Sequence, residues 1–500
     1  MILFLLVLVS IASTADAQDC PPGYEPYTGA TAINHTIHWT PCPLVFEPSL
    51  ECAALNVSLD YTNASYGLLE LQLVRIPADD AVSTGKSIFY NPGGPGSSGV
   101  ASLINDGAYY RSIINGTYHI VSFDPRGVGL TLPYECPELS PAEHSLLPLN
   151  NPLSLNATYV TYDNQGELCG QSDYRLSGEL VGTAFVARDI NAVFEALHED
   201  GLISYVPRQN RRMVLDGNVN PTDYYHGLNE ESVDSVDAAL LHFFQTCVEA
   251  GPDYCTLARE GYSGQQLRDE FFTFLHTVKN TSDYLKDEGG NLVHRNIYKQ
   301  ISSEVYDGLR GPTGWPELAG KLYSYYQYLN FSSGHMKREI DLTATSIKVP
   351  MALNAITCGD WDDIPGNITD FENWLALYQK RSKFGGDQAL IHILYQCSLW
   401  QVNAKEKFNG TFTNIKTKTP ILFVNNPYDP VTPLISAQNA SSGFVDSRVL
   451  QHIGVGHCSG ADASDCVDKK VALYFDTGEL PNVDEVCQPN RVPFSRKINP

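Results

Sequence analysis

The sequence predicts an α/β fold in which a mostly parallel sheet is flanked by helices and interrupted by a helical insertion. Short apolar runs end in Gly- or Pro-rich loops and alternate with amphipathic stretches, as in parallel strands joined by crossover helices. Between about residues 223 and 346, long helix-like stretches replace the strand signals. The 500 residues fit one enlarged fold with such an insertion.

The N-terminus predicts a secretory signal peptide over residues 1–17. An apolar run from Ile2 to Ala12 is followed by the small-residue pattern Ala15-Asp16-Ala17. The run is shorter than the roughly 20 residues that span a bilayer. No Lys or Arg precedes it, so the amino terminus alone supplies the positive charge. A buried N-terminal strand or helix is the alternative, and we expect the chain to be secreted.

Residues 18–222 predict the first part of the sheet domain. Leu69–Ile76 alternates in polarity, and Ser87–Tyr90 and Tyr118–Phe123 are short apolar runs that end at turn-forming residues. Thr183–His198 is amphipathic with helical period, and Arg212–Leu215 is a further short strand.

Residues 223–346 predict a helical region, through Val233–Val248, Gly264–Val278 and Glu317–Asn330. It is either a helical domain with its own core or a lid inserted over a pocket in the sheet domain. Strand signals resume only afterwards, with Ile421–Val424, which favours the lid. Residues 347–500 then form the second part of the sheet domain.

Charge and composition exclude several partners. With 43% hydrophobic and 18% charged residues the chain can bury a core. The 33 Lys and Arg against 57 Asp and Glu give a net charge of -24. The electrostatic field of this negative charge repels nucleic acid and anionic lipid, so neither nucleic acid nor a membrane is expected as a partner. Oligomeric state has no signal in the sequence.

Twelve cysteines, all beyond residue 17, predict disulfide bonds in an oxidising compartment. Short spacings favour the pairs Cys42–Cys52, Cys247–Cys255 and Cys458–Cys466. For the others we predict Cys136–Cys169, Cys358–Cys397 and Cys20–Cys487. Neither Cys-x-x-Cys nor His-Glu-x-x-His occurs, so neither a metal nor a cofactor is expected.

Acceptor sequences for N-glycosylation are spread along the chain, which fits a secreted glycoprotein. They lie at Asn34, Asn56, Asn63, Asn115, Asn156, Asn280, Asn330, Asn367, Asn409 and Asn439.

The strongest chemical signal is an Asp followed by a His near the C-terminus. Asp429 follows the predicted strand Ile421–Val424 and is flanked by prolines, and His457 lies in a glycine-rich turn. A carboxylate at a strand end can orient a catalytic imidazole, and Asp before His is the chain order of α/β-hydrolases. Each residue alone favours a structural role, but the pair in this order favours a catalytic dyad. Asp216 is an alternative candidate for the acid, but we expect it mainly to form a turn.

A glycine-rich loop, residues 91–99, follows the strand Ser87–Tyr90. The backbone N–H groups of Gly93 and Gly94 are candidates for an oxyanion hole. Residues 94–99 also satisfy the dinucleotide pattern G-x-G-x-x-G, with Asp124 at a later strand end. The proline within this turn and the unexplained Asp429/His457 pair argue against that alternative. Residues 83–87 imitate a phosphate loop but lack its first glycine.

At this point the chain resembles a known family. The segments NPGGPGSSG, FDPRGVGLT, RRMVLDGNVNP, TPILFVNNPYDPVTPLISAQ and GVGHCS are similar to α/β-hydrolase serine peptidases of the tripeptidyl aminopeptidase and proline iminopeptidase type. The resemblance implies an α/β-hydrolase fold, Asp429 as acid, His457 as base and Gly93 and Gly94 as the oxyanion loop. It also implies a peptide substrate with a free N-terminus.

The nucleophile of such an enzyme is missing from this sequence. No serine satisfies G-x-S-x-G, the strand-to-helix elbow that exposes the nucleophile. In the family the elbow falls between the helix through Asp200 and the strand from Arg212, but only residues 201–211 separate them here, where roughly 25 would be needed. The break falls near Val206 and Pro207.

The predicted function is a secreted serine exopeptidase whose activity is impaired by this loss. Two alternatives remain open: a non-catalytic protein that binds peptides in the retained pocket, and an esterase or lipase on the same fold. Binding without turnover would indicate the first, and hydrolysis of short acyl esters without peptide cleavage the second.

Overall fold

The computed structural model describes most of the chain after the predicted signal peptide. It covers residues 36–42, 49–139, 152–197, 212–227, 229–279, 283–286, 292–295, 297–331, 351–362, 367–387 and 397–495. In these parts strands and helices alternate in two main sheets, and none of the helices is both long and apolar enough to cross a bilayer.

The first sheet has the strand order β1-β2-β3-β5-β4. Its strands are β1 (Thr40–Pro41), β2 (Glu51–Ser58), β3 (Leu68–Ile76), β4 (Ser87–Phe89) and β5 (His119–Phe123). It is antiparallel from β1 to β5, because residues 59–67 between β2 and β3 are too few for a crossover helix. Only β4 and β5, which are joined through helix α1 (Gly99–Ile113), run parallel.

The second sheet, with the order β11-β10-β9-β6, is wholly parallel, as the sequence predicts. Its strands are β6 (Val214–Asp216), β9 (Leu422–Asn425), β10 (Arg448–His452) and β11 (Val486–Cys487). Every residue of β6 and β9 is buried, because helices cover both faces of the sheet. Helix α13 (Leu434–Ser442) packs on one face and α14 (Asp465–Thr477) on the other.

The two sheets end at β4 and β6, and neither strand pairs beyond its own sheet within the described residues. Helices α1 and α14 bridge them: the Tyr109 hydroxyl donates to Asp468 Oδ1 at 2.9 Å. Residues 198–211, between helix α4 (Thr183–Ala196) and β6, lie outside the described residues, and so does the predicted break at Val206/Pro207.

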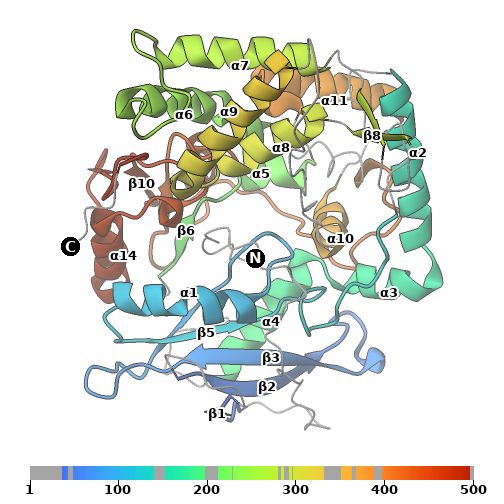
Figure 1. The fold of residues 1–500 in the computed structure, drawn as a ribbon. Coiled ribbons are helices and arrows are strands. Elements are labelled where there is room, and N and C mark those ends of the chain that lie inside the picture. Colours follow the sequence, from blue (N-terminus) through green and yellow to red (C-terminus); the bar gives the residue numbers. More distant parts are fainter. Residues whose placement is uncertain are drawn as a thin grey trace.

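The helical region lies on the far side of the molecule from the first sheet (Figure 1). It comprises α5 (Pro221–Tyr225), α6 (Val236–Ala250), α7 (Gly264–Lys279), α8 (Ile297–Gly308), α9 (Trp315–Phe331) and the hairpin β7 (Asp283–Lys286) and β8 (Leu292–Arg295). The predicted helices correspond to α6, α7 and α9. Helical structure continues past residue 346 as α10 (Met351–Asp360) and α11 (Ile368–Arg381), and the next strand among the described residues is β9.

The remaining helices are shorter or peripheral. They are α2 (Pro152–Cys169), α3 (Ser172–Leu180) and the 3₁₀ turns η1 (Ala64–Tyr66), η3 (Glu230–Val233), η4 (Pro312–Gly314), η5 (Gly385–Asp387) and η6 (Ser459–Ala461).

The described residues form five disulfides, and four of these were predicted correctly. The confirmed pairs are Cys42–Cys52, Cys136–Cys169, Cys247–Cys255 and Cys358–Cys397. The predicted pairs Cys458–Cys466 and Cys20–Cys487 are wrong, because Cys466 bonds to Cys487. Cys466 lies on α14 and faces β11, whereas Cys458 lies in the turn after β10 beside His457; Cys20 lies outside the described residues.

Asn56 is 6% exposed within β2, and this burial disfavours the glycosylation predicted there. Five acceptor asparagines are exposed: Asn63, Asn115, Asn367, Asn409 and Asn439. The other four, or their side chains, lie outside the described residues: Asn34, Asn156, Asn280 and Asn330.

Candidate active site

The carboxylate of Asp429 is held rigidly in the turn after β9. The side chain is fully buried, and its Oδ1 accepts the backbone N–H groups of Val431 and Thr432 at 2.8 and 2.9 Å. Its Oδ2 accepts the Thr432 hydroxyl and the Cys458 N–H, both at 2.9 Å. Burial by itself raises the pKa of Asp429. The charge of His457, its hydrogen bond to the carboxylate and the backbone donors outweigh burial, so the pKa lies below its ordinary value. Asp429 is therefore an ionised acid at neutral pH.

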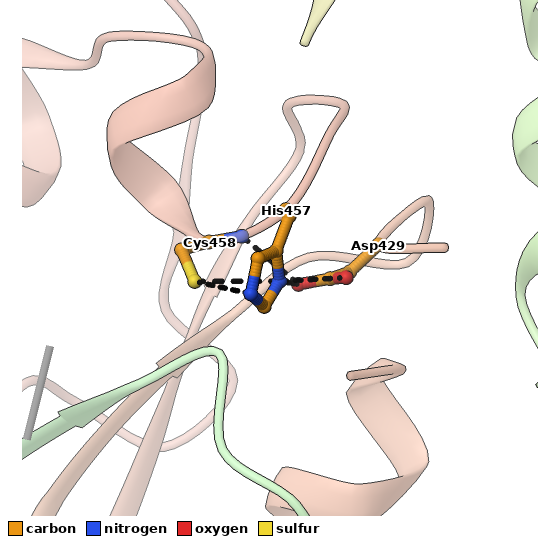
Figure 2. Close-up of side chains that lie close together, drawn as sticks. All are labelled: Asp429, His457 and Cys458. Carbon is orange, nitrogen blue, oxygen red and sulfur yellow. Dashed lines mark hydrogen bonds and ion pairs between the residues drawn. The ribbon is translucent and has the colours of Figure 1, made fainter. Parts of the chain in front are cut away.

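The imidazole of His457 meets this carboxylate. Its Nδ1 lies 3.2 Å from Oδ1 and 3.1 Å from Oδ2 of Asp429, and Figure 2 shows the ring between the carboxylate and the Cys458 sulfur. The structure thus brings the predicted acid and base together. Because Nδ1 faces the acid, Nε2 is the nitrogen left for proton transfer, as in a serine-hydrolase triad.

The turn that presents His457 requires a glycine at position 456. Gly456 has a φ of +96°, and a Cβ there would lie 2.4 Å from the carbonyl oxygen of Arg310. The backbone N–H of His457 donates to that same carbonyl at 2.8 Å. The glycine therefore allows the histidine loop to dock against the end of α8.

No hydroxyl of the described residues hydrogen-bonds to Nε2 of His457. The Thr432 hydroxyl lies 3.2 Å from the ring, but at Nδ1, and its proton is donated to Asp429. The buried Cys458 sulfur lies 3.4 Å from Nδ1 and 3.6 Å from Nε2, alongside the ring. The predicted absence of a nucleophile stays a prediction, because residues 198–211, where the elbow is expected, lie outside the described residues.

The donor atoms of Asp429, His457 and Cys458 lie within 4.8 Å of one another, close enough for a metal ion. Both carboxylate oxygens of Asp429, however, already accept two protein donors each besides the imidazole. A carboxylate with its lone pairs filled in this way suits an orienting acid better than a metal ligand.

The glycine loop adopts the backbone conformation that its sequence requires. Gly93 and Gly94 have φ values of +82° and +112°, and a Cβ on Gly94 would lie 2.9 Å from the Gly96 nitrogen. The N–H of Gly93 donates to Asn91 Oδ1 at 2.8 Å, so it points into the loop itself. Gly94 stays the predicted oxyanion donor with an N–H available for this role.

The dinucleotide alternative for this loop is disfavoured. Asp124, which would have to reach a ribose, is fully buried and accepts the Ser98 hydroxyl at 2.6 Å and the Val100 N–H at 3.1 Å. It therefore fixes the start of α1 and faces no ligand.

Asp216, the rival acid, does not contact the imidazole directly. It is 6% exposed at the end of β6 and accepts the Ser459 N–H at 2.9 Å and the Ser459 hydroxyl. Burial raises its pKa to about 7; the charge of Asp429 adds to this increase, and Ser459 and His457 oppose it. Asp429 is therefore the acid of the dyad.

Three residues of the helical region hold the loops of Asp429 and His457, and sequence reasoning missed all of them. The Arg310 carbonyl binds the histidine loop, and the Tyr306 hydroxyl donates to the Pro430 carbonyl at 3.0 Å. The His242 ring stacks on Tyr428, with centroids 4.2 Å apart and an interplanar angle of 15°. No motif marks these residues, because their contacts arise only when α6 and α8 dock on the loops.

Comparisons with known proteins find similarity to hydrolases. Residues 382–487, which include both Asp429 and His457, match the α/β-hydrolase family model described as TAP-like protein. The chain is 24% identical to the tripeptidyl aminopeptidase of Streptomyces lividans, over 93% of this chain and 89% of that protein. It is 28% identical to the serine protease Hip1 of Mycobacterium tuberculosis, over 91% of each.

Two further similarities involve esterases. The chain is 23% identical to carboxylesterase B of Mycobacterium tuberculosis, over 94% of this chain and 93% of that protein. Among solved structures, esterase E22 aligns with 13% identity and a TM-score of 0.29, over 85% of this chain and 98% of that one.

The family match and the peptidase relatives define the class: the chain has an α/β-hydrolase fold and the features of a hydrolase. More particularly, they confirm its resemblance to serine peptidases of the tripeptidyl aminopeptidase type.

Proposed function

We propose that this chain is a secreted exopeptidase-type hydrolase, related to enzymes that release residues or short peptides from free N-termini, and that it is impaired by the loss of its nucleophile. The observation that carries the proposal is the Asp429–His457 dyad, whose Nε2 meets no hydroxyl in the described parts of the chain. The substrate class is supported by the name tripeptidyl aminopeptidase, which two relatives with about a quarter of residues identical carry.

Each retained group has a role in this chemistry. His457 Nε2 would accept the proton of an attacking hydroxyl, and Asp429 would hold the ring tautomer and stabilise the imidazolium. Gly94 would offer its backbone N–H to the tetrahedral oxyanion, whereas the predicted Gly93 N–H is already donated to Asn91 Oδ1. The helical region would act as a lid, and the contacts of α6 and α8 with the two loops support a position beside the site.

Secretion is part of the proposal. The five disulfides are typical of an oxidising compartment, and the apolar segment before residue 18 fits a cleaved signal.

Hydrolysis of N-terminal tripeptide anilides tests the proposal, with the Streptomyces lividans relative as the active reference. Removing a triad member leaves about 10³–10⁴-fold acceleration over water in serine proteases, far below the intact enzymes. We therefore expect kcat/KM at least 10³-fold below the reference, with any residual rate abolished in His457→Ala. A rate within tenfold of the reference would overturn the proposed impairment.

Esterase activity is the second candidate, favoured by the similarity to carboxylesterase B. Activated acyl esters need less catalytic assistance than amides, so a general base alone could hydrolyse them through water. Turnover of p-nitrophenyl acetate that requires His457, without cleavage of anilides, would select this function. Calorimetric binding of the peptides without turnover of either substrate would instead indicate a non-catalytic binding protein.

A further inference from the structure

A small cleft lies between α1 and α14, at the facing edges of the two sheets. Ile88 of β4 and Asp216 of β6 both line it, so it lies between the edge strands of the two sheets that the described residues form. It is distinct from the imidazole face of the dyad, since neither His457 nor Asp429 lines it.

One wall of this cleft is a cluster of three tyrosine rings. Tyr90 and Tyr110 have ring centroids 4.8 Å apart, and those of Tyr109 and Tyr110 are 5.4 Å apart. Aromatic faces attract organic cations through their quadrupole, and clusters of such rings recognise alkylammonium groups.

Two carboxylates lie beside these rings. Asp216 is 94% buried, yet no Lys or Arg forms an ion pair with it within the described residues, and its bonded donors, both from Ser459, are neutral. Asp468 accepts the Tyr109 hydroxyl at 2.9 Å. A buried carboxylate without a counter-charge is costly, and a bound cation would offset that cost.

Most of the remaining lining is apolar. Ile113 ends α1 and Ile114 follows it, and Val467, Val471 and Phe475 belong to α14. No basic side chain of the described residues lines the cleft. An apolar cleft with a few converging polar groups is the usual form of a small-molecule site.

We propose that this cleft binds a small organic cation with an apolar body, an alkyl- or arylalkyl-ammonium, whose head group lies between Asp216 and the tyrosine cluster. The alkyl or aryl body lies against Val471 and Phe475. This site goes beyond the proposed hydrolase function and does not depend on it.

Calorimetric titration of the full chain with n-hexylammonium, hexan-1-ol and hexanoate tests the proposal. We expect n-hexylammonium to bind at least tenfold more tightly than hexan-1-ol, and hexanoate to bind most weakly. The isosteric variant Asp216→Asn should abolish the preference for the amine while retaining hexan-1-ol binding. Equal affinities for the amine and the alcohol, an unchanged preference in Asp216→Asn, or no binding of any probe would each overturn the proposal.

Substitutions on the two faces of α14 locate the site. Val471→Phe fills the cleft and should weaken n-hexylammonium binding at least tenfold, whereas Leu473→Phe, at a residue that is 37% exposed and outside the cleft lining, should not change it. Equal effects of the two variants would contradict the assignment. Thermal unfolding of each variant establishes that it is folded, and ester and anilide hydrolysis, measured separately, report on the proposed function alone.

Discussion

The two sheets of this molecule differ in what they retain of a hydrolase site. The second sheet carries Asp429 and His457, and five protein donors fix the carboxylate of that acid. The first sheet carries the glycine loop, but its edge strand β4 faces a cleft. The acid–base pair is therefore organised within the second sheet, which has its own core under α13 and α14.

We expect the largest effect from removing the side chain of Asp429, which tests whether this acid organises the second sheet. Asp429→Ala would leave several buried donors unsatisfied, and we expect it to destabilise the chain by about 4 kcal/mol in urea unfolding. Asp476→Ala, at an exposed position of α14, is the matched control and should change stability by less than about 0.5 kcal/mol. Similar effects of the two changes would mean that the acid does not organise the second sheet.

We expect the second-largest loss of stability from removing the disulfide Cys466–Cys487. The bond Cys466–Cys487 closes a 21-residue separation between α14 and β11, so the double variant Cys466→Ser/Cys487→Ser should cost roughly 3 kcal/mol. Peptide mapping under non-reducing conditions checks the pairing directly. Recovery of a Cys458–Cys466 peptide would contradict it.

Acid should weaken the second sheet through His452. This side chain on β10 is fully buried, and burial lowers its pKa from 6.5 to about 4. Folding therefore favours the neutral ring, and its stabilisation is present above about pH 6.5 and is lost as the pH falls toward 4. We expect His452→Leu to remove about 2 kcal/mol of the stability change between pH 7 and pH 5. His226→Leu, at an exposed site, should leave that change intact.

We expect the smallest effect from a substitution in the helical region, which tests whether α6 positions the dyad. His242→Ala removes the ring that stacks on Tyr428 beside the acid, and an aromatic pair of this kind contributes about 1 kcal/mol beyond its buried area. His276→Ala, at an exposed position of α7, is the control. In NMR spectra the first variant should shift the His457 ring resonances and the second should not. An unchanged His457 spectrum in His242→Ala would show that α6 does not position the dyad.

The dyad could be predicted from the sequence because each member lies in a short motif fixed by local structure. Asp429 follows a buried strand, and His457 sits in a turn that only Gly456 permits. What could not be predicted depends on docking between distant segments. The partner of Cys466, the carbonyl of Arg310 beneath His457, and the burial of Asn56 are set by which surfaces meet, and no residue spacing encodes that.

The strand directions illustrate the same limit. Apolar runs before Gly- and Pro-rich loops correctly predicted parallel strands around β9, where helices separate successive strands. The same reasoning did not detect the antiparallel pairs of β1 to β3, because alternation in Leu69–Ile76 indicates one covered face and not a direction.

The central claim is that His457 Nε2 has no serine to activate. Intact-protein mass spectrometry after incubation with a serine-directed fluorophosphonate tests it most directly, with the Streptomyces lividans relative as a labelled reference. We predict an unchanged mass for this chain. A stoichiometric adduct on one serine that disappears in His457→Ala would contradict the claim.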